Sequence, residues 1–155
     1  MTDINERLAK AGLTLPEPPA ALASYVPAVA VPSGTIVYVS GQTPMEGGAP
    51  MVTGRVGHGV DLETAQACAR RCALQGLSAL RAQIGDLGRL RRVVKLDGFV
   101  ACDHTFTDHP RVINGASDLL EELLGEAGRH ARAAVGVSSL PLGVPVEIAF
   151  TFVVE

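Results

Sequence analysis

Apolar residues recur at helical spacing in three parts of the chain. The longest predicts a helix from an N-cap at Asp61 to about Ile84, before Gly85-Asp86. Its apolar stripe consists of Ala65, Cys68, Ala69, Cys72, Leu77 and Leu80. A second pattern predicts a helix over 109–124 that ends at Gly125, with Val112, Ile113, Leu119, Leu120, Leu123 and Leu124 as its buried set. A short amphipathic helix is expected over 3–12, followed by a proline-rich link.

Between the helices, β-branched and alternating runs predict strands. Residues 26–31 and 35–40 are separated by Pro32-Ser33-Gly34, which is typical of a hairpin turn. Residues 89–102 predict a third strand, and residues 43–60 predict a long glycine-rich loop. Two further runs, 130–137 and 144–150, are separated by Pro141 and Gly143 and predict an antiparallel C-terminal hairpin.

The order of these elements is strand pair, helix, strand, helix, strand pair. It predicts an α+β fold in which a mixed β-sheet carries two α-helices on one face. The strands are apolar on both sides, so the opposite face of the sheet must also be covered. We divide the chain into an N-terminal helix and link, residues 1–20, and one domain, residues 21–155.

Composition limits the classes of partner. The 155 residues are enough for one domain with a sizeable core, but only 4% are aromatic, so the core must consist mainly of Ala, Val and Leu. A formal net charge of −3 gives no general attraction for nucleic acid or an anionic membrane. The N-terminus lacks the apolar stretch of a signal peptide, and three cysteines form no disulfide framework. We therefore expect a cytoplasmic protein without a membrane or nucleic-acid partner.

Two charged residues interrupt the apolar C-terminal runs, namely Arg132 and Glu147. Charges in buried strands need compensation. An anionic ligand bound by Arg132, with Glu147 managing water or protons nearby, would explain both. On spacing alone, a structural Arg–Glu ion pair, or two charges on a solvated sheet face, is the favoured explanation.

Five segments, in order, resemble the RidA (YjgF) family. They are Tyr-Val-Pro-Ala-Val (25–29), Tyr-Val-Ser-Gly-Gln-Thr-Pro (38–44), Val-Ile-Asn-Gly (112–115), Ala-Arg-Ala-Ala-Val (131–135) and Leu-Pro-Leu-Gly-Val-Pro-Val-Glu (140–147). The resemblance implies a chorismate-mutase-like fold and a homotrimer around a central sheet-lined barrel. It also implies metal-independent, cofactor-free hydrolysis of reactive enamines and imines of the 2-aminoacrylate type to 2-keto acids and ammonia, a form of metabolite damage control.

The resemblance also implies roles for individual residues, in three pockets at subunit interfaces. Arg132 would bind the carboxylate of the imine, and Glu147 would orient or deprotonate the attacking water. The remaining pocket residues would be Tyr25, contributed by a neighbouring subunit, together with Ser40, Gly41 and Asn114. Ordinary structural roles remain open for each: an aromatic anchor, a strand-end turn and a helix residue that satisfies a loop.

The chain departs from the family pattern at one point. The family's Arg is commonly followed by Ser-Cys or a similar pair, whereas Ala133 and Ala134 follow Arg132. A non-catalytic carboxylate-binding or regulatory protein therefore remains an alternative. A second alternative is RNA cleavage, an activity also attributed to relatives, although the acidic composition and few aromatic residues argue against it. Converting Glu147 to Gln would separate the first from an enzyme, because only an enzyme has turnover to lose.

Other polar clusters favour structural explanations. Asp103, His104, Asp108 and His109 lack a recognised metal-ligand spacing, so we expect a solvated loop and a helix cap there. Cys68 and Cys72 share a helix face without a second pair of ligands, which favours small core residues. His130 is close in sequence to Arg132 and could line its pocket. We predict no metal site.

Overall fold

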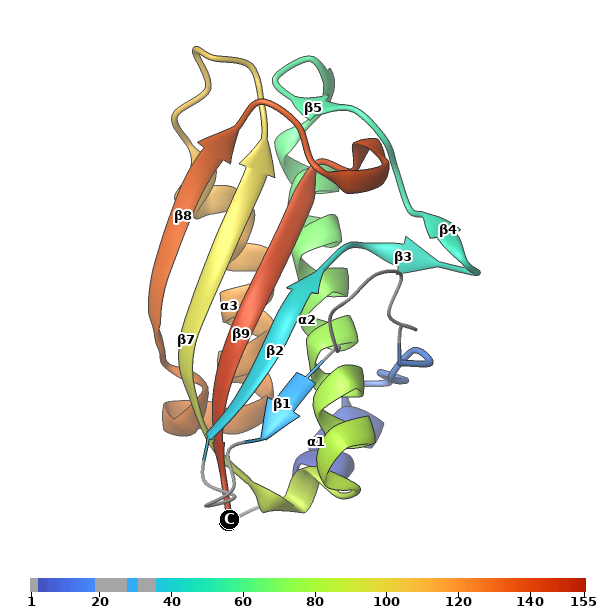
Figure 1. Cartoon of the computed structure of the whole chain (residues 1–155), viewed down its shortest axis with the longest axis vertical. Coiled ribbons are helices and arrows are strands. Elements are labelled where there is room, and N and C mark those ends of the chain that lie inside the picture. The colour runs from blue at the N-terminus through green and yellow to red at the C-terminus, as the bar shows by residue number, and fades with distance from the viewer. Residues whose placement is uncertain (1–2, 19–27, 31–35) are drawn as a thin grey trace.

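A five-stranded mixed sheet forms one layer of the protein (Figure 1). The structure is a computed structural model, and it describes residues 3–18, 28–30 and 36–155. The strand order is β1-β2-β9-β7-β8. The strands are β1 (Ala28–Ala30), β2 (Ile36–Gln42), β7 (Leu90–Ala101), β8 (Ala131–Val137) and β9 (Val146–Val154). The predicted turn at Pro32-Ser33-Gly34 and the boundary between residues 20 and 21 lie outside the described residues.

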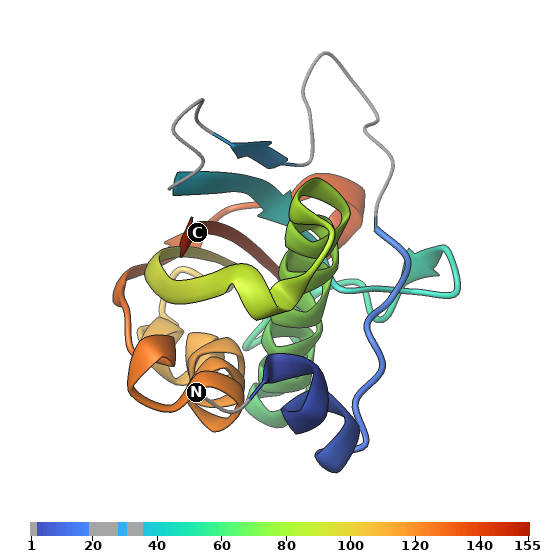
Figure 2. The same ribbon diagram turned by 90° about the horizontal axis from the view of Figure 1, so that it is seen from below.

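Two helices, α2 (Leu62–Ile84) and α3 (His109–Leu124), form the second layer, on one face of the sheet (Figure 2). Asp61 caps α2 by accepting a hydrogen bond from the Thr64 amide at 2.7 Å. All the apolar positions predicted for α2 are buried, as are those of α3 except the partly buried Leu124. The predicted fold class is confirmed. The short helix α1 (Ile4–Lys10) adds Ile4 and Leu8 to the same core.

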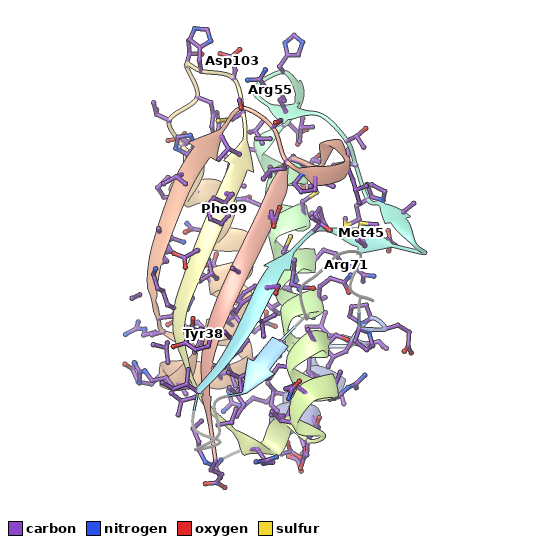
Figure 3. All side chains as sticks on the ribbon, in the orientation of Figure 1. Tyr38, Met45, Arg55, Arg71, Phe99 and Asp103 are labelled. Atoms are coloured by element: carbon purple, nitrogen blue, oxygen red, sulfur yellow. The ribbon has the colours of Figure 1, made fainter. Side chains whose placement is uncertain are left out.

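The segment between β2 and α2 contains only two-residue strands, which confirms the predicted long loop. They are β3 (Met45–Glu46), β4 (Ala49–Pro50), β5 (Arg55–Val56) and β6 (Gly59–Val60). Side chains tie this segment to the rest of the fold: Arg71 donates to Met45 O at 2.6 Å, and Arg55 donates to Cys102 O (Figure 3). Three 3-10 helices complete the described elements, at Leu87–Arg89, Gly125–Gly128 and Pro141–Gly143.

The predicted C-terminal hairpin is wrong. Among the described strands, β8 pairs only with β7, in parallel, and β9 lies between β7 and β2, antiparallel to both. The reason is the helix α3 that connects β7 to β8, because a helical crossover returns the chain parallel to the preceding strand. β8 is consequently an edge strand, and the turn at Pro141–Gly143 leads the chain across β7.

This topology changes the setting of both charged residues. Arg132, on the edge strand, is exposed rather than buried, and Glu147, on the central strand β9, is half-buried. The expectation that both lie within buried strands is therefore wrong for Arg132 and only partly right for Glu147.

The contact between the two helices depends on Gly115. A Cβ atom at this position would lie 2.1 Å from the backbone oxygen of Gln66 on α2. Alanine normally favours a helix over glycine by about 1 kcal/mol, but this clash is with backbone and cannot be relieved by a rotamer change. We expect Gly115→Ala to destabilise the protein by about 2–4 kcal/mol. Chemical denaturation would measure it, and an unchanged midpoint would contradict the close approach of the helices.

Candidate functional site

A cavity of about 240 Å³ lies between α3, the start of β8 and the turn that joins them. It is lined by Asn114, Ser117, Glu121, Gly128, Arg129, His130 and Arg132. The structure therefore brings two of the predicted site residues, Arg132 and Asn114, to one cavity. Arg132 is opposite the core residue Leu96 in the β7–β8 register and so points to the helix side of the sheet.

Two hydrogen bonds to α3 orient the Arg132 guanidinium. Its Nη1 donates to Ser117 Oγ at 3.0 Å, and its Nη2 donates to Pro110 O at 3.3 Å. A guanidinium has five N–H donors, so three remain for a ligand. The alternative left open by the sequence, an ion pair between Arg132 and Glu147, does not form within the chain, because the two residues lie on opposite faces of the sheet.

The other arginine of the cavity is already neutralised. Arg129 Nε donates to Glu121 Oε1 at 2.9 Å, and its Nη1 lies 3.4 Å from Glu126 Oε2. Within residues 3–18, 28–30 and 36–155, no carboxylate forms an ion pair with Arg132. The cavity therefore has one cation available to an anionic ligand.

Glu147 belongs to a second group of residues, on the face of the sheet away from the helices. Its neighbours in β9, Val146 and Ile148, are fully buried toward the helices, so Glu147 points the other way, opposite Phe99 of β7. Figure 3 labels Phe99 and Tyr38 on this open face. Tyr38 is 52% exposed although it is a large aromatic side chain.

A β-bulge places Ser40 and Gly41 beside Glu147. The β2–β9 register shifts between Val39 and Gln42, so two residues of β2 oppose one of β9. A Cβ atom on Gly41 would lie 2.0 Å from Glu147 Oε1. Glycine is thus required where the carboxylate lies against the strand. The structure brings together three of the predicted site residues here: Ser40, Gly41 and Glu147.

Burial raises the pKa of the Glu147 carboxyl above its usual value. Among the residues that the structure describes, none donates a hydrogen bond to this carboxylate or pairs with it as a cation. A half-buried carboxylate with a raised pKa is a stronger base than an ordinary surface glutamate.

For the enzyme activity that the resemblance implies, we expect Gly41→Ala to lower turnover while leaving stability nearly unchanged. The Glu147 side chain ends in a flexible carboxylate, which can rotate away from a new methyl group at small cost but then leaves its present position. A decrease in kcat of about 10-fold or more, with a melting temperature within about 2 °C of wild type, is expected. Wild-type turnover by this variant would show that the carboxylate position is unimportant.

The predicted site residues therefore form two groups on opposite faces of one sheet. Arg132 and Asn114 lie at the helix side near the β8 edge, whereas Ser40, Gly41 and Glu147 lie on the open face. Tyr25 lies outside the described residues. Ser117 was missed in the sequence, although it is three residues after Asn114 and so on the same side of α3.

The cysteines and the polar cluster around Asp103, for which the sequence favours structural roles, lie in ordinary structural surroundings. Cys68 and Cys72 are fully buried in the core, as predicted, and burial raises the pKa of Cys68 to about 11. Asp103 accepts hydrogen bonds from the amide and hydroxyl of Thr105 at 3.0 and 2.9 Å. In the described part of the chain, no three His, Cys, Asp or Glu side chains are grouped to hold a metal, and no helix is long and apolar enough to span a membrane.

Comparison with known families identifies the class. Residues 5–152 match the family model described as "YjgF/chorismate mutase-like, putative endoribonuclease". The chain belongs to this family, which confirms the resemblance inferred from its five segments.

Three solved structures illustrate the range of similarity. The chain is 48% identical to Atu1372 of Agrobacterium tumefaciens, a protein of unknown function, with a TM-score of 0.89 over 98% of this chain and 93% of that one. It is 32% identical to a "putative endoribonuclease" of Shewanella oneidensis, with a TM-score of 0.93 over 99% and 100%. It is 25% identical to Escherichia coli TdcF with bound serine, with a TM-score of 0.61 over 90% and 94%.

Proposed function

We propose that the protein is a metal-independent hydrolase that deaminates enamine and imine intermediates of the 2-aminoacrylate type to 2-keto acids and ammonia. The observation that carries the proposal is the hydrogen bonding of the Arg132 guanidinium. Two hydrogen bonds hold its guanidinium at a cavity wall, three of its donors remain free, and its neighbouring arginine is already paired. Such an arginine is suited to bind a carboxylate by two parallel hydrogen bonds.

The chemistry requires a placed water and a base. Water attacks C2 of the imine, and Glu147 accepts a proton from it as the new C–O bond forms. The imine nitrogen takes the proton that Glu147 removed from the water. Glu147 then removes the proton of the carbinolamine hydroxyl and passes it to the nitrogen, so that the C=O bond forms, the C–N bond breaks, and ammonia leaves with the 2-keto acid. The imine carbon is already electrophilic, so carboxylate binding and water placement supply the catalysis.

We propose that two copies of the chain form each site, since Arg132 and Glu147 lie on opposite faces of one protomer. The open face of the sheet exposes two large apolar side chains, Tyr38 at 52% and Val135 at 45%, and Val135 lies beside Phe99 of β7. Exposed large apolar side chains on a sheet face favour association. A homotrimer around a central barrel, as in the family that the chain resembles, would cover this face and bring Glu147 of one protomer toward the Arg132 cavity of the next.

The serine bound to TdcF is consistent with a ligand that carries an α-carboxylate. The endoribonuclease description of other relatives suggests RNA as an alternative substrate. The charge of this chain argues against it, because RNA binding relies on available Lys and Arg. The net charge is −3, and Arg70, Arg91 and Arg129 are all paired with carboxylates.

The proposal is tested by imine hydrolysis. An amino-acid oxidase or a threonine dehydratase generates 2-imino acids in solution, and their loss is followed with and without the protein. Faster loss with stoichiometric 2-keto acid is expected for small and branched imines. No acceleration with any of them would contradict the enzyme and favour a carboxylate-binding protein, which is next measured by its affinity for 2-oxobutanoate.

A further inference from the structure

A chain of hydrogen bonds extends from Arg132 into the turn after α3. Arg132 Nη1 donates to Ser117 Oγ at 3.0 Å, Ser117 Oγ lies 3.0 Å from His130 Nε2, and His130 Nδ1 lies 2.6 Å from Gly128 O. These side chains line the same cavity. Neither Ser117 nor His130 contacts Glu147, whose side chain is on the other face of the sheet.

For a neutral imidazole, the chemistry of the last acceptor fixes the direction of these hydrogen bonds. A backbone carbonyl only accepts, so His130 Nδ1 must carry a hydrogen. In the neutral imidazole, Nε2 is then the acceptor, and the Ser117 hydroxyl donates to it. The hydroxyl hydrogen therefore points away from Arg132, and an oxygen lone pair faces the guanidinium.

The far end of this series of hydrogen bonds, at Gly128, is closely packed. Gly128 is buried, and a Cβ atom there would lie 2.1 Å from the backbone oxygen of Leu120 on α3. The Gly128 carbonyl is thus held by backbone packing, and it holds the imidazole ring in turn. Arg132 is anchored to α3 a second time through Pro110 O.

We propose that Ser117 and His130 are positioning residues that hold the Arg132 guanidinium ready for the substrate carboxylate. The inference rests on the proposed function and specifies how its anion site is built. A free arginine side chain loses rotamer entropy when it binds a carboxylate, and a side chain that is already fixed loses less. We call the hydrogen bonds from Gly128 through His130 and Ser117 to Arg132 the relay. The relay therefore acts on substrate affinity and leaves the chemical step unchanged.

Two substitutions at His130 separate the relay from simple packing. Asn places its amide near the position of Nδ1, so His130→Asn keeps the bond to Gly128 and loses the acceptor for Ser117. Gln reaches the position of Nε2, so His130→Gln keeps that acceptor and loses the bond to Gly128. Ser117→Ala removes the link to Arg132 itself. His104→Asn is the matched control, because that side chain is 90% exposed in a loop.

For imine hydrolysis, we expect Ser117→Ala and His130→Asn each to raise KM about 5- to 20-fold, with kcat within about twofold of wild type. His130→Gln should stay within about threefold in KM, and the Ser117→Ala/His130→Asn double variant should be no worse than either single one. Wild-type KM in Ser117→Ala, or equal losses for Asn and Gln, would overturn the relay while leaving the deaminase proposal intact.

Two readouts do not depend on turnover. The dissociation constant of 2-oxobutanoate, measured by calorimetry, should follow the same order of variants. Histidine side-chain nitrogen shifts should show the Nδ1–H tautomer for neutral His130 in the wild type. An Nε2–H tautomer would overturn the relay. If the wild type neither hydrolyses imines nor binds 2-oxobutanoate, both proposals fail; binding without turnover rejects the deaminase alone.

Discussion

Replacing Arg132 with alanine is expected to lower kcat/KM for imine hydrolysis by about 10²- to 10⁴-fold. Hydrogen bonds to charged groups contribute about 1.5–3 kcal/mol each, and the proposed grip uses two of them. Three donors remain after the bonds to Ser117 and Pro110, and a carboxylate would accept two of them. An amino-acid oxidase generates the 2-imino acid, and the rate of its loss is measured at several concentrations.

Two further variants test whether the decrease in kcat/KM comes from the lost carboxylate contact. Arg132→Lys keeps the charge but not the planar fork, so an intermediate loss of about 10-fold or more is expected. Arg81→Ala removes an exposed arginine at the end of α2 and should leave kcat/KM unchanged. Equal rates for wild type and Arg132→Ala would reject the carboxylate grip even if the protein is a deaminase.

The helices could be predicted from the sequence because their signals are local. The apolar stripe, the Asp61 cap and the glycines at 85 and 125 fix the bounds of α2 and α3 within a residue. Strand pairing is not local. The short segment between β8 and β9 is typical of a hairpin, and nothing within it indicates that β7 lies between these strands.

The same limit applies to the candidate site. Arg132 and Glu147 can be recognised as candidates in the sequence because they are charges in apolar runs. The alternation of side chains, however, shows only which residues of one strand share a face. Which residues share a face of the whole sheet depends on the pairing, and here it separates the two charges. Ser117 is a small polar residue on an amphipathic helix, and its bond to Arg132 comes from the return of the chain after α3.

Replacing Glu147 with glutamine is expected to lower kcat by about 10²- to 10⁴-fold, which is the usual contribution of a general base. Glutamine has nearly the same size and can still lie against Gly41, but it cannot accept the proton of the attacking water. Affinity for 2-oxobutanoate should remain within about threefold, because Arg132 is unchanged. A variant with wild-type kcat would assign water activation to another group.

The pH dependence gives an independent test of the same residue. Because burial raises the pKa of Glu147, the wild-type rate should fall as the pH drops through that raised pKa, when the base becomes protonated. Wild type and Glu147→Gln are compared from pH 4.5 to 8. The glutamine variant should have a low rate that lacks this inflection, and a wild-type profile that is flat over the range would contradict a carboxylate base.

Stability should change in the opposite direction to activity. A carboxyl whose pKa is higher in the folded than in the unfolded chain binds its proton more tightly when folded, so the native state loses stability as the pH rises above the ordinary value of 4.5. Glu147→Gln removes this loss of stability at high pH, because glutamine does not ionise. Its melting temperature should exceed that of wild type near pH 8, and the difference should shrink toward pH 4.5. A less stable variant at pH 8 would mean that the assembled protein compensates the ionised carboxylate with a partner. Greater stability together with lost turnover would instead show that the buried charge is maintained for catalysis at the expense of the fold.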